Sequence, residues 1–390
     1  MSSTLRLIPL VLLALGMFLY PQDVLSSATT GLTLWWRFVL PALLPFFILS
    51  ELLIGQGFVH FLGIILEPLM RPLFHLPGRA SFVVVMGYTS GFPLGAVLTA
   101  RLRQKGEITR EEGERLLAFT NNPSPGFMFG AVASGMLGKP NLGIILACSV
   151  YLANLGVGLL YRFYRFNTIS KQVTPAPTLK RALQEMRQAQ TLDGRPFGQI
   201  LGDSIRNSAT TVITVGGFLV FFSVVIRLLT TWHVTSFLAI LIQPLLGNLL
   251  PLRGLESIIN GLFEMTLGCQ GTIQTFPILS QQIGLLSFIM GWGGLSVFAQ
   301  VASFTGETDL RMGPFVIARF LHAFLALGLS QLFLFIAKIP ASAPVFPRSY
   351  STTELWLNTW RQSFLMFIGT IVFLLVLSLL YHYWSRYQRR

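Results

Sequence analysis

Residues 80–100 read ASFVVVMGYTSGFPLGAVLTA and contain no Asp, Glu, Lys or Arg. A charge-free stretch of about 20 residues can cross the roughly 30 Å hydrocarbon core of a bilayer as a helix. Its middle, residues 87–95, nevertheless holds Gly87, Gly91, Pro93 and Gly95, and glycine and proline weaken or interrupt helices. Hydrocarbon cannot hydrogen-bond the freed backbone groups, so such an interruption must line a cavity or pack inside protein. The stretch predicts a broken membrane helix.

The composition of the whole chain agrees with a membrane protein. Of its 390 residues, 53% are hydrophobic and only 11% are charged, whereas soluble domains average about 25% charged residues. Further charge-free stretches cover residues 116–138, 140–161, 207–226, 228–252, 265–306, 320–337 and 362–385. We expect eight to eleven membrane segments, given the length that one span requires. The first, residues 5–20, is interpreted as a retained helix, with a cleaved signal peptide as the alternative.

The formal net charge of +13 would suggest a nucleic-acid partner if the basic residues formed one face. They occur instead in short runs between apolar segments, which is typical of cytoplasmic loops. Residues 162–196 form the longest such run and are predicted to be a cytoplasmic linker that contains an amphipathic helix near residues 179–190. The basic C-terminal residues Arg386, Arg389 and Arg390 are predicted to lie on the same side. Cys148 and Cys269 lie in apolar sequence and are interpreted as small hydrophobic residues.

The two halves of the chain resemble each other. Residues 116–119 (LLAF) align with residues 285–288 (LLSF), and residues 67–69 (EPL) align with residues 243–245 (QPL). With the linker cytoplasmic, the two copies have opposite orientations, an arrangement typical of transporters. The predicted fold is an all-α polytopic membrane protein with two inverted-topology repeats and broken or re-entrant helices. Its predicted units are residues 1–30, 31–161, 162–206, 207–338 and 339–390.

Three further breaks follow the one at residues 87–95, namely residues 121–126, 264–272 and 291–296. In inverted-repeat transporters, breaks at corresponding positions meet near the middle of the bilayer and bind the solute there. The residues expected to bind it are Thr89, Ser90, Gly91, Asn121, Asn122, Ser124, Glu264, Gln270, Gln300 and Arg319. The alternative is a set of kinks and close helix contacts, because Gly126, Gly130 and Ser134 also have the spacing of tightly packed membrane helices.

Charged residues within apolar sequence are usually functional. Glu264 is expected to bind a donor-rich solute or to accept a coupling proton. Arg319 could pair with Glu264, attract an anion, or extend to the membrane surface, and Arg227 is interpreted as an anchor at that surface. Residues 101–115 alternate basic and acidic side chains and predict a solvated, salt-bridged surface helix with Thr109 as its N-cap.

The run from Gly87 to Val132, with its SGFPLG and NNPSP motifs, resembles the YlbJ-type sporulation integral membrane proteins (SpoVV family), which carry a nucleoside-recognition or gate domain. Residues 261–270 and 291–301 are similar to that family too, and the resemblance covers roughly residues 30–335. It implies a multi-pass protein of endospore-forming bacteria, associated with passage of dipicolinic acid through the outer forespore membrane. The wider gate-domain group resembles concentrative nucleoside transporters, which implies substrate-lining positions at Asn121, Asn122, Ser124, Glu264 and Gln300.

The expected function is transport of a small organic anion, with dipicolinic acid moved into the forespore as the first candidate. A permease for nucleosides or related heterocycles is one alternative, and a sporulation membrane scaffold that recruits partners through the linker is another. The sequence has no metalloprotease, hydrolase or P-loop motif, so neither an enzyme, a metal nor a cofactor is expected. The expected partners are a small-molecule anion and membrane lipids, without nucleic acid, and a homo-oligomer is compatible with the sequence.

Overall fold

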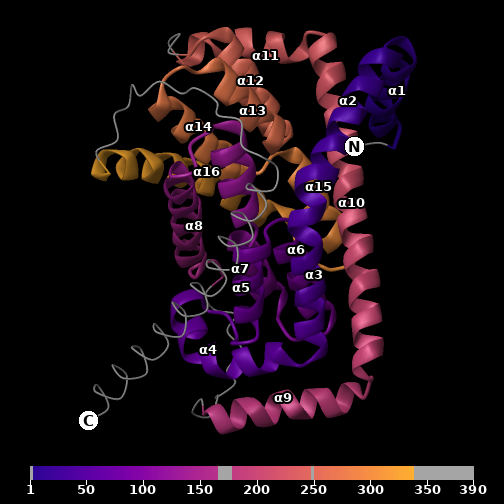
Figure 1. Cartoon of the computed structure of the whole chain (residues 1–390), viewed down its shortest axis with the longest axis vertical. Coiled ribbons are helices and arrows are strands. Elements are labelled where there is room, and N and C mark those ends of the chain that lie inside the picture. Colours follow the sequence, from indigo (N-terminus) through magenta and orange to yellow (C-terminus); the bar gives the residue numbers. More distant parts are fainter. Residues whose placement is uncertain (1–2, 166–177, 247–249, 338–390) are drawn as a thin grey trace.

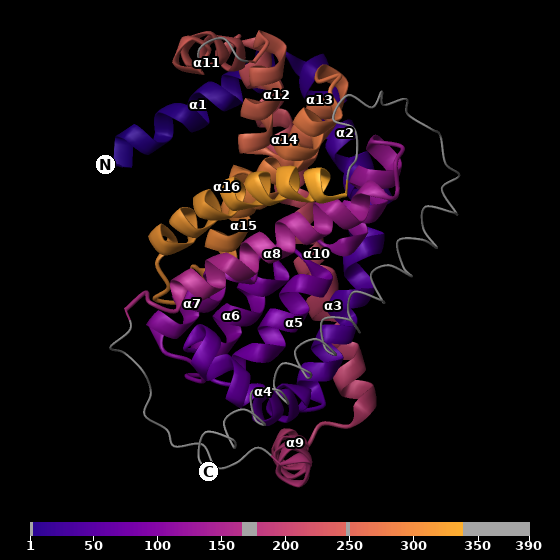
Figure 2. The ribbon, with the colours of Figure 1, turned by 90° about the vertical axis from the view of Figure 1, so that its left-hand side faces the viewer.

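The computed structural model describes residues 3–165, 178–246 and 250–337, and these residues form helices and loops without strands (Figures 1 and 2). The part before the linker contains α1 (Ser3–Leu19), α2 (Pro21–Leu34), the π-helix η1 (Trp35–Val39), α3 (Leu40–Gly55), α4 (Phe58–Phe74), α5 (Ala80–Ser90), α6 (Leu94–Gln104), α7 (Arg110–Phe119), the π-helix η2 (Gly126–Met136) and α8 (Leu142–Tyr161). The later part contains α9 (Leu179–Asp193), α10 (Phe197–Thr231), α11 (Val234–Ile242), the 3₁₀-helix η3 (Pro244–Leu246), α12 (Leu252–Phe263), α13 (Met265–Thr275), α14 (Leu279–Trp292), α15 (Leu295–Thr305) and α16 (Met312–Ile336).

Four helical segments of the described residues are long and apolar enough to cross a membrane: α8, α10, the α14–α15 pair and α16. Two strongly bent pairs, α1–α2 and α3–α4, bring the number to six if each pair is one span. The all-α polytopic membrane fold is therefore confirmed, but the prediction of eight to eleven segments was too high for this part of the chain. The span expected at residues 362–385 lies outside the described residues.

The excess in the prediction comes from charge-free stretches that do not form single long helices. Residues 80–100 are divided between α5 and α6, which pack against each other, and every residue of α5 is buried. At 1.5 Å per residue, an 11-residue helix is only about 16 Å long, roughly half of the hydrocarbon thickness. The α5–α6 pair is therefore a short, broken helix inside the protein.

In the first half, the turn between α5 and α6 contacts the segment that joins α7 to η2. The Phe92 N–H donates a hydrogen bond to the Asn122 carbonyl oxygen (2.8 Å). Gly91 has φ +83°, and a Cβ atom on it would lie 2.6 Å from the Ser124 nitrogen. Both the positive φ and the close approach therefore require glycine at this crossing.

The second half has a corresponding crossing. The break between α14 and α15 consists of Gly293 and Gly294, with φ +90° and +85°. A Cβ atom on Gly294 would lie 3.0 Å from the Phe263 carbonyl oxygen and 3.1 Å from the Met265 nitrogen, on either side of Glu264. In each half, the first break therefore crosses the second break, as the internal repeat predicts. The inverted orientation of the two halves and the boundaries of the predicted units remain predictions.

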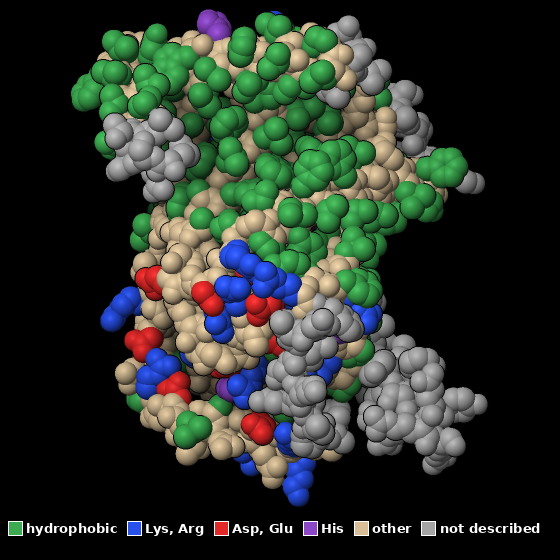
Figure 3. Space-filling view, turned by 180° about the vertical axis from the view of Figure 1, so that it is seen from behind, with side chains coloured by type: hydrophobic (Ala, Val, Ile, Leu, Met, Phe, Trp, Pro, Cys, Tyr) green, Lys and Arg blue, Asp and Glu red, His purple; other side chains and the backbone are tan. Residues whose placement is uncertain are grey.

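The two halves share much of their packing. Helix α16 packs against α8 and α14, and a single buried hydrophobic cluster contains residues from η2, α8, α14 and α16. On the opposite side, the 35-residue α10 packs along α2 and α3 (Figure 1). The amphipathic helix predicted near residues 179–190 is present as α9, which packs on α4. Charged side chains gather over the half of the molecule nearer α9, and hydrophobic ones over the other half (Figure 3).

Helix α7 begins with the predicted N-cap, since the Thr109 hydroxyl accepts a hydrogen bond from Glu112 N–H and the Glu112 carboxylate accepts one from Thr109 N–H. The prediction of a solvated surface helix was wrong. Glu112, Glu114 and Arg115 are 4%, 1% and 1% exposed. The charges are buried because other parts of the chain pack over α7, notably α8 and α16.

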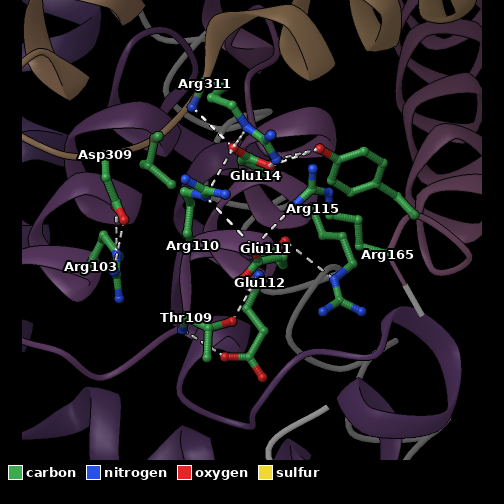
Figure 4. A network of polar contacts seen from close by, with 12 residues as sticks. Arg103, Thr109, Arg110, Glu111, Glu112, Glu114, Arg115, Arg165, Asp309 and Arg311 are labelled. Atoms are coloured by element: carbon green, nitrogen blue, oxygen red, sulfur yellow. Dashed lines mark hydrogen bonds and ion pairs between the residues drawn. The ribbon is translucent and has the colours of Figure 1, made fainter. Parts of the chain in front are cut away.

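A polar network joins α7 to the loop between α15 and α16 (Figure 4). The Arg311 guanidinium donates to both carboxylate oxygens of Glu114 (2.7 and 2.8 Å), and the Tyr164 hydroxyl donates to the same carboxylate (2.9 Å). Nearby, Arg103 makes a two-pronged ion pair with Asp309 (2.8 and 2.9 Å). These contacts connect the two halves of the chain beside the membrane-spanning helices.

Candidate functional site

A cavity of about 600 Å³ lies where the four helix breaks meet, and we call it the central cavity. Each break contributes to its wall, through Phe92, Ser124, Glu264 and Ser296. The rest of the wall includes Trp36, Arg37 and Val39 of η1, Pro41 and Leu43 of α3, Gly126, Phe127, Gly130 and Ala131 of η2, Val215 and Leu219 of α10, Thr266 of α13, and Gln300 of α15. The volume falls within the range of about 300–1,000 Å³ that is usual for small-molecule sites.

The position of this cavity along α10 indicates its depth. Helix α10 has 35 residues, which corresponds to about 52 Å, well beyond the hydrocarbon thickness. Only residues 207–226 of α10 are continuously charge-free. Val215 and Leu219, which line the cavity, lie near the middle of that apolar segment. The cavity is therefore level with the centre of the apolar part of α10.

Ser124 is fixed at the start of η2. Its hydroxyl oxygen accepts a hydrogen bond from the Phe127 N–H (3.1 Å) and so satisfies one of the free donors at this helix end. The two prolines beside it, Pro123 and Pro125, prevent α7 from continuing through this segment. Ser124 thus contributes to the cavity wall from a rigid, irregular segment.

Glu264 lies at the first break of the second half, between α12 and α13. It has extended backbone geometry, and its carboxylate accepts a hydrogen bond from the Leu267 N–H (2.7 Å) as the N-cap of α13. The residue is only 5% exposed. Gln300, also 5% exposed, lines the same cavity from α15. The second half therefore supplies a carboxylate and an amide to the site.

Four helices begin at the central cavity. These are α6, whose preceding residues Phe92 and Pro93 form the turn, η2 after Ser124, α13 after Glu264, and α15 after Gly294. The N-terminus of a helix carries a partial positive charge and free N–H donors. The four helix N-termini together favour a negative charge in the cavity. The carboxylate of Glu264, which caps α13, already supplies part of that charge.

Arg37 is a cavity residue that the sequence interpretation missed. It lies in the π-helix η1, and no hydrogen bond or ion pair ties its side chain to another described residue. The neighbouring Trp35 fixes η1 to α10, because its indole N–H donates to the Val212 carbonyl oxygen (3.0 Å). π-Helices often occur at functional sites. The signal in the sequence was a single charge between Trp36 and Phe38 within an apolar run.

Arg319 lies behind the cavity wall rather than in it. Its guanidinium donates hydrogen bonds to the carbonyl oxygens of Asn121 (2.5 Å) and Ala118 (2.8 Å) and to the side-chain oxygen of Asn154 (2.7 Å). Among the described residues it makes no ion pair with Glu264, and it is fully buried rather than extended to the surface. Two of the three roles considered for it were therefore wrong, because the carbonyl groups at the end of α7 bind it.

Asn121 and Asn122 pack with Arg319 on the same side of the break. The Asn121 side-chain oxygen accepts a hydrogen bond from the Ala96 N–H (3.1 Å), and its amide donates to the Leu117 carbonyl oxygen (3.0 Å). The Asn122 side-chain oxygen accepts from the Asn154 amide (2.7 Å). These two residues organise the break, and neither belongs to the cavity wall.

Four further predicted residues do not line the central cavity, namely Thr89, Ser90, Gly91 and Gln270. The Thr89 hydroxyl donates within its own helix to the Val85 carbonyl oxygen (2.9 Å), and Ser90 is buried beside it. Gly91 makes the crossing with Ser124, and Gln270 is exposed on α13. Of the ten predicted residues, Ser124, Glu264 and Gln300 line the central cavity. The part of the chain that the structure describes contains no group of three or more His, Cys, Asp or Glu side chains that could hold a metal ion.

The fold is that of an all-α polytopic integral membrane protein. Residues 36–170 match the family model described as Gate, nucleoside recognition. This segment includes Arg37 and Ser124 but ends before Glu264.

The chain is 46% identical over 308 residues to the sporulation integral membrane protein YlbJ of Bacillus subtilis (strain 168), an alignment that covers 78% of this chain and 76% of that one. It therefore belongs to the YlbJ family of sporulation integral membrane proteins, as the sequence motifs predicted. An uncharacterised protein of Alkalihalophilus pseudofirmus is 30% identical over 133 residues, which cover 33% of this chain and 28% of that protein. No solved structure matches the chain.

Proposed function

We propose that the protein transports a small organic anion and that the anion is dipicolinic acid, moved into the forespore through the outer forespore membrane. The observation that carries this proposal is the single cavity shared by all four helix breaks and level with the middle of the apolar part of α10. Discontinuous helices that meet at such a depth are the solute-binding elements of inverted-repeat transporters.

The chemistry of the cavity supports an anionic, planar solute. Arg37 has a planar guanidinium that can bind a carboxylate with two hydrogen bonds. Four helix N-termini add further positive potential. Trp36, Phe92 and Phe127 bring aromatic rings to the wall, against which a flat ring can pack. This chemistry requires only reversible binding and no covalent step.

When Glu264 is ionised, its negative charge repels a carboxylate solute. Its hydrogen bond to the Leu267 N–H reduces that repulsion but leaves a negative charge in the wall. We therefore propose that Glu264 carries a proton when the anion is bound, which would couple proton binding to transport.

The proposal is tested by direct binding to the purified protein in detergent, with labelled dipicolinate and labelled uridine. Arg37→Gln is expected to weaken dipicolinate binding at least about 10-fold, equivalent to about 1.4 kcal/mol, because it removes the cavity's cationic group. Glu264→Gln is expected to preserve or strengthen that binding. Arg227→Gln is the matched control, since Arg227 pairs with Asp23 on the exterior (2.6 Å). Unchanged dipicolinate binding in Arg37→Gln would overturn the proposed anion site.

A permease for nucleosides or related heterocycles is the second candidate. Glu264 and Gln300 favour it, because a carboxylate and an amide can bind the donors of a ribose or a base. In the same experiment this candidate predicts that uridine binds, that dipicolinate does not, and that Glu264→Gln abolishes binding.

A membrane scaffold is the third candidate, because α9 lies at one end of the molecule, beside α4 (Figures 1 and 2). Replacing residues 166–192 with a neutral spacer, which keeps Tyr164 and Arg195 in place, decides this point. The scaffold predicts loss of sporulation function with solute binding intact, whereas the transporter predicts that function is retained.

A further inference from the structure

A second cavity, of about 360 Å³, lies at the linker end of the molecule, and we call it the linker-side cavity. Glu51 and Ile54 of α3 and Asp203, Ser204 and Asn207 of α10 form part of its wall. The central cavity uses the same two helices, through Leu43 of α3 and Val215 and Leu219 of α10. Helices α3 and α10 pack side by side (Figure 1). The residues that line the two cavities therefore follow one another along a single pair of helices.

The spacing between the cavities is the same on both helices. Leu43 and Glu51 are eight residues apart on α3, and Asn207 and Val215 are eight residues apart on α10. Eight residues correspond to about 12 Å along a helix. Residues four apart face the same side of a helix, so Phe47 lies on the face that joins Leu43 to Glu51.

Between the cavities these faces carry hydrophobic side chains together with Ser208 and Thr211, and the Thr211 hydroxyl donates a hydrogen bond to the Asn207 carbonyl oxygen (2.9 Å). Phe47 is 1% exposed and Val212 is 0% exposed, and both belong to the same hydrophobic cluster as Leu43 and Val215. On α10, Ser208 lies between the two cavities, and its buried hydroxyl has no hydrogen-bond partner among the described residues. A buried hydroxyl without a hydrogen-bond partner is unfavourable. Its place between the two cavities fits a second conformation in which water reaches it.

Charged side chains line the linker-side cavity, whereas the segments between the two cavities carry none. Arg101 pairs with Glu51, and Arg195 pairs with Asp203 (2.9 Å). Lys105 also lines the cavity, and no ion pair ties it to the residues that the structure describes. Asn207 marks the start of the charge-free part of α10, which places this cavity at the level where the apolar segment ends.

We infer that the linker-side cavity is the outer chamber of the same pathway, that it admits small organic anions from the linker side, and that Phe47 and Val212 form the closed barrier to the central cavity. This inference rests on the proposed transport function. It assigns a second solute-accessible chamber, with Lys105 as its unpaired cation, and a barrier of two named side chains.

The test measures aqueous access to single cysteines in the full chain, in vesicles of known orientation. Cys148 and Cys269 are first replaced by Ala. Ser204→Cys then reports the linker-side cavity, and Val215→Cys reports the central cavity. An anionic, membrane-impermeant methanethiosulfonate is added from the linker side. We expect rapid reaction at position 204 and slow reaction at position 215.

Smaller side chains in the barrier should let the reagent pass from the linker-side cavity to the central cavity. Phe47→Ala and, independently, Val212→Ala are expected to accelerate the reaction of the cysteine at position 215 at least 10-fold from the linker side. Phe74→Ala is the matched control, because Phe74 is equally buried but stacks on Phe119 (4.7 Å), away from both cavity walls. It should leave the rate unchanged.

The inference is overturned if the cysteine at position 204 fails to react from the linker side. It is also overturned if the rate at position 215 is unchanged in whichever of the two barrier variants folds. These measurements need no solute. Failure of dipicolinate binding with normal labelling would therefore count against the proposed function alone, and normal binding without the rate increase would count against the barrier alone.

Discussion

Arg319 illustrates how a buried charge is accommodated in this fold. An unpaired cation in a protein interior is very unfavourable, yet the guanidinium of Arg319 is fully buried. It lies at the C-terminal end of α7, where carbonyl groups lack helical partners and where positive charge is favoured. The Phe315 ring, 5.5 Å from the guanidinium carbon, adds a cation–π contact. Arg319 is therefore a positioning residue for the break that carries Ser124.

Replacing Arg319 should be strongly destabilising. We expect Arg319→Met to lower the free energy of unfolding in detergent by about 3 kcal/mol, because several buried oxygen atoms lose a charged hydrogen-bond donor. Arg227→Met removes an exposed ion pair with Asp23 and should cost less than about 1 kcal/mol. Equal losses in the two variants, measured by chemical denaturation, would contradict the role given to Arg319.

The residues of the cavity were only partly predictable from the sequence. Ser124 and Glu264 were identified because each interrupts an apolar run beside a helix-breaking or capping signal. Arg37 was missed because its flanking aromatic residues resemble an ordinary membrane-surface anchor. Its place in the cavity depends on η1 being fixed to α10 by Trp35, a contact between residues 177 positions apart in the chain. The oxygen partners of Arg319 depend on similarly distant contacts.

The broken helices depend on backbone contacts that leave no room for side chains. At both crossings a glycine of one broken helix touches the backbone of another, at Gly91 in the first half and at Gly294 in the second. The carboxylate of Glu264 then caps α13 at the same point. The geometry of the central cavity is therefore set largely by the backbone.

Gly294→Ala tests this dependence. We expect a loss of about 1–3 kcal/mol in the free energy of unfolding, because alanine is strained at φ +85° and its Cβ would press on the Phe263 carbonyl oxygen. Gly217→Ala is the control, since Gly217 lies within α10 with open space around its Cβ position. It should cause no loss of stability, because alanine is favoured over glycine in a helix interior by up to about 1 kcal/mol. A neutral Gly294→Ala variant would show that the crossing tolerates a side chain.

The helices and their breaks could be predicted from the sequence more fully than the contacts that surround them. Glycine and proline clusters located three of the four breaks, and the amphipathic pattern located α9. In the predicted break at residues 264–272 the chain is interrupted only at Glu264, and Gly268 and Gly271 lie within α13. The burial of α7 was not predictable, because its alternating charges have the pattern of a solvated helix. The buried Glu114 is satisfied by residues far away in the chain, Arg311 from beyond α15 and Tyr164 from beyond α8.

At the scale of the whole molecule, Glu114 connects the two halves. Its side chain is fully buried and binds both Arg311 and Tyr164. Burial alone would raise the pKa of Glu114, but hydrogen bonds from Arg311 and Tyr164 outweigh burial and hold the pKa below its ordinary value of 4.5. The carboxylate is therefore ionised in the folded protein at neutral pH.

This lowered pKa predicts the pH dependence of stability. A carboxyl group whose pKa is lower in the folded state contributes stability that is fully present above the unfolded pKa and is lost as the pH falls through the folded pKa. We expect wild type to be more stable than Glu114→Gln by a constant amount from about pH 7 to about pH 5, and the difference to shrink below about pH 4.5. Chemical denaturation across this range measures it.

Glu185→Gln provides the control, because Glu185 is partly exposed on α9 and its ion pair with Arg181 is long (4.0 Å). It should show no comparable difference at any pH. A Glu114→Gln deficit that persists unchanged into acid would contradict the assignment of the effect to the ionised carboxylate.

The contacts of Arg319 and Arg311 also bear on residues 36–170, the segment that matches the Gate model. Both arginines lie far outside that segment, yet they bind its Asn121 carbonyl and its Glu114 carboxylate. A truncated polypeptide ending near residue 170 would lack both arginines and the helix α16 that covers α7. We therefore expect that the segment, although recognisable by its sequence, does not fold on its own.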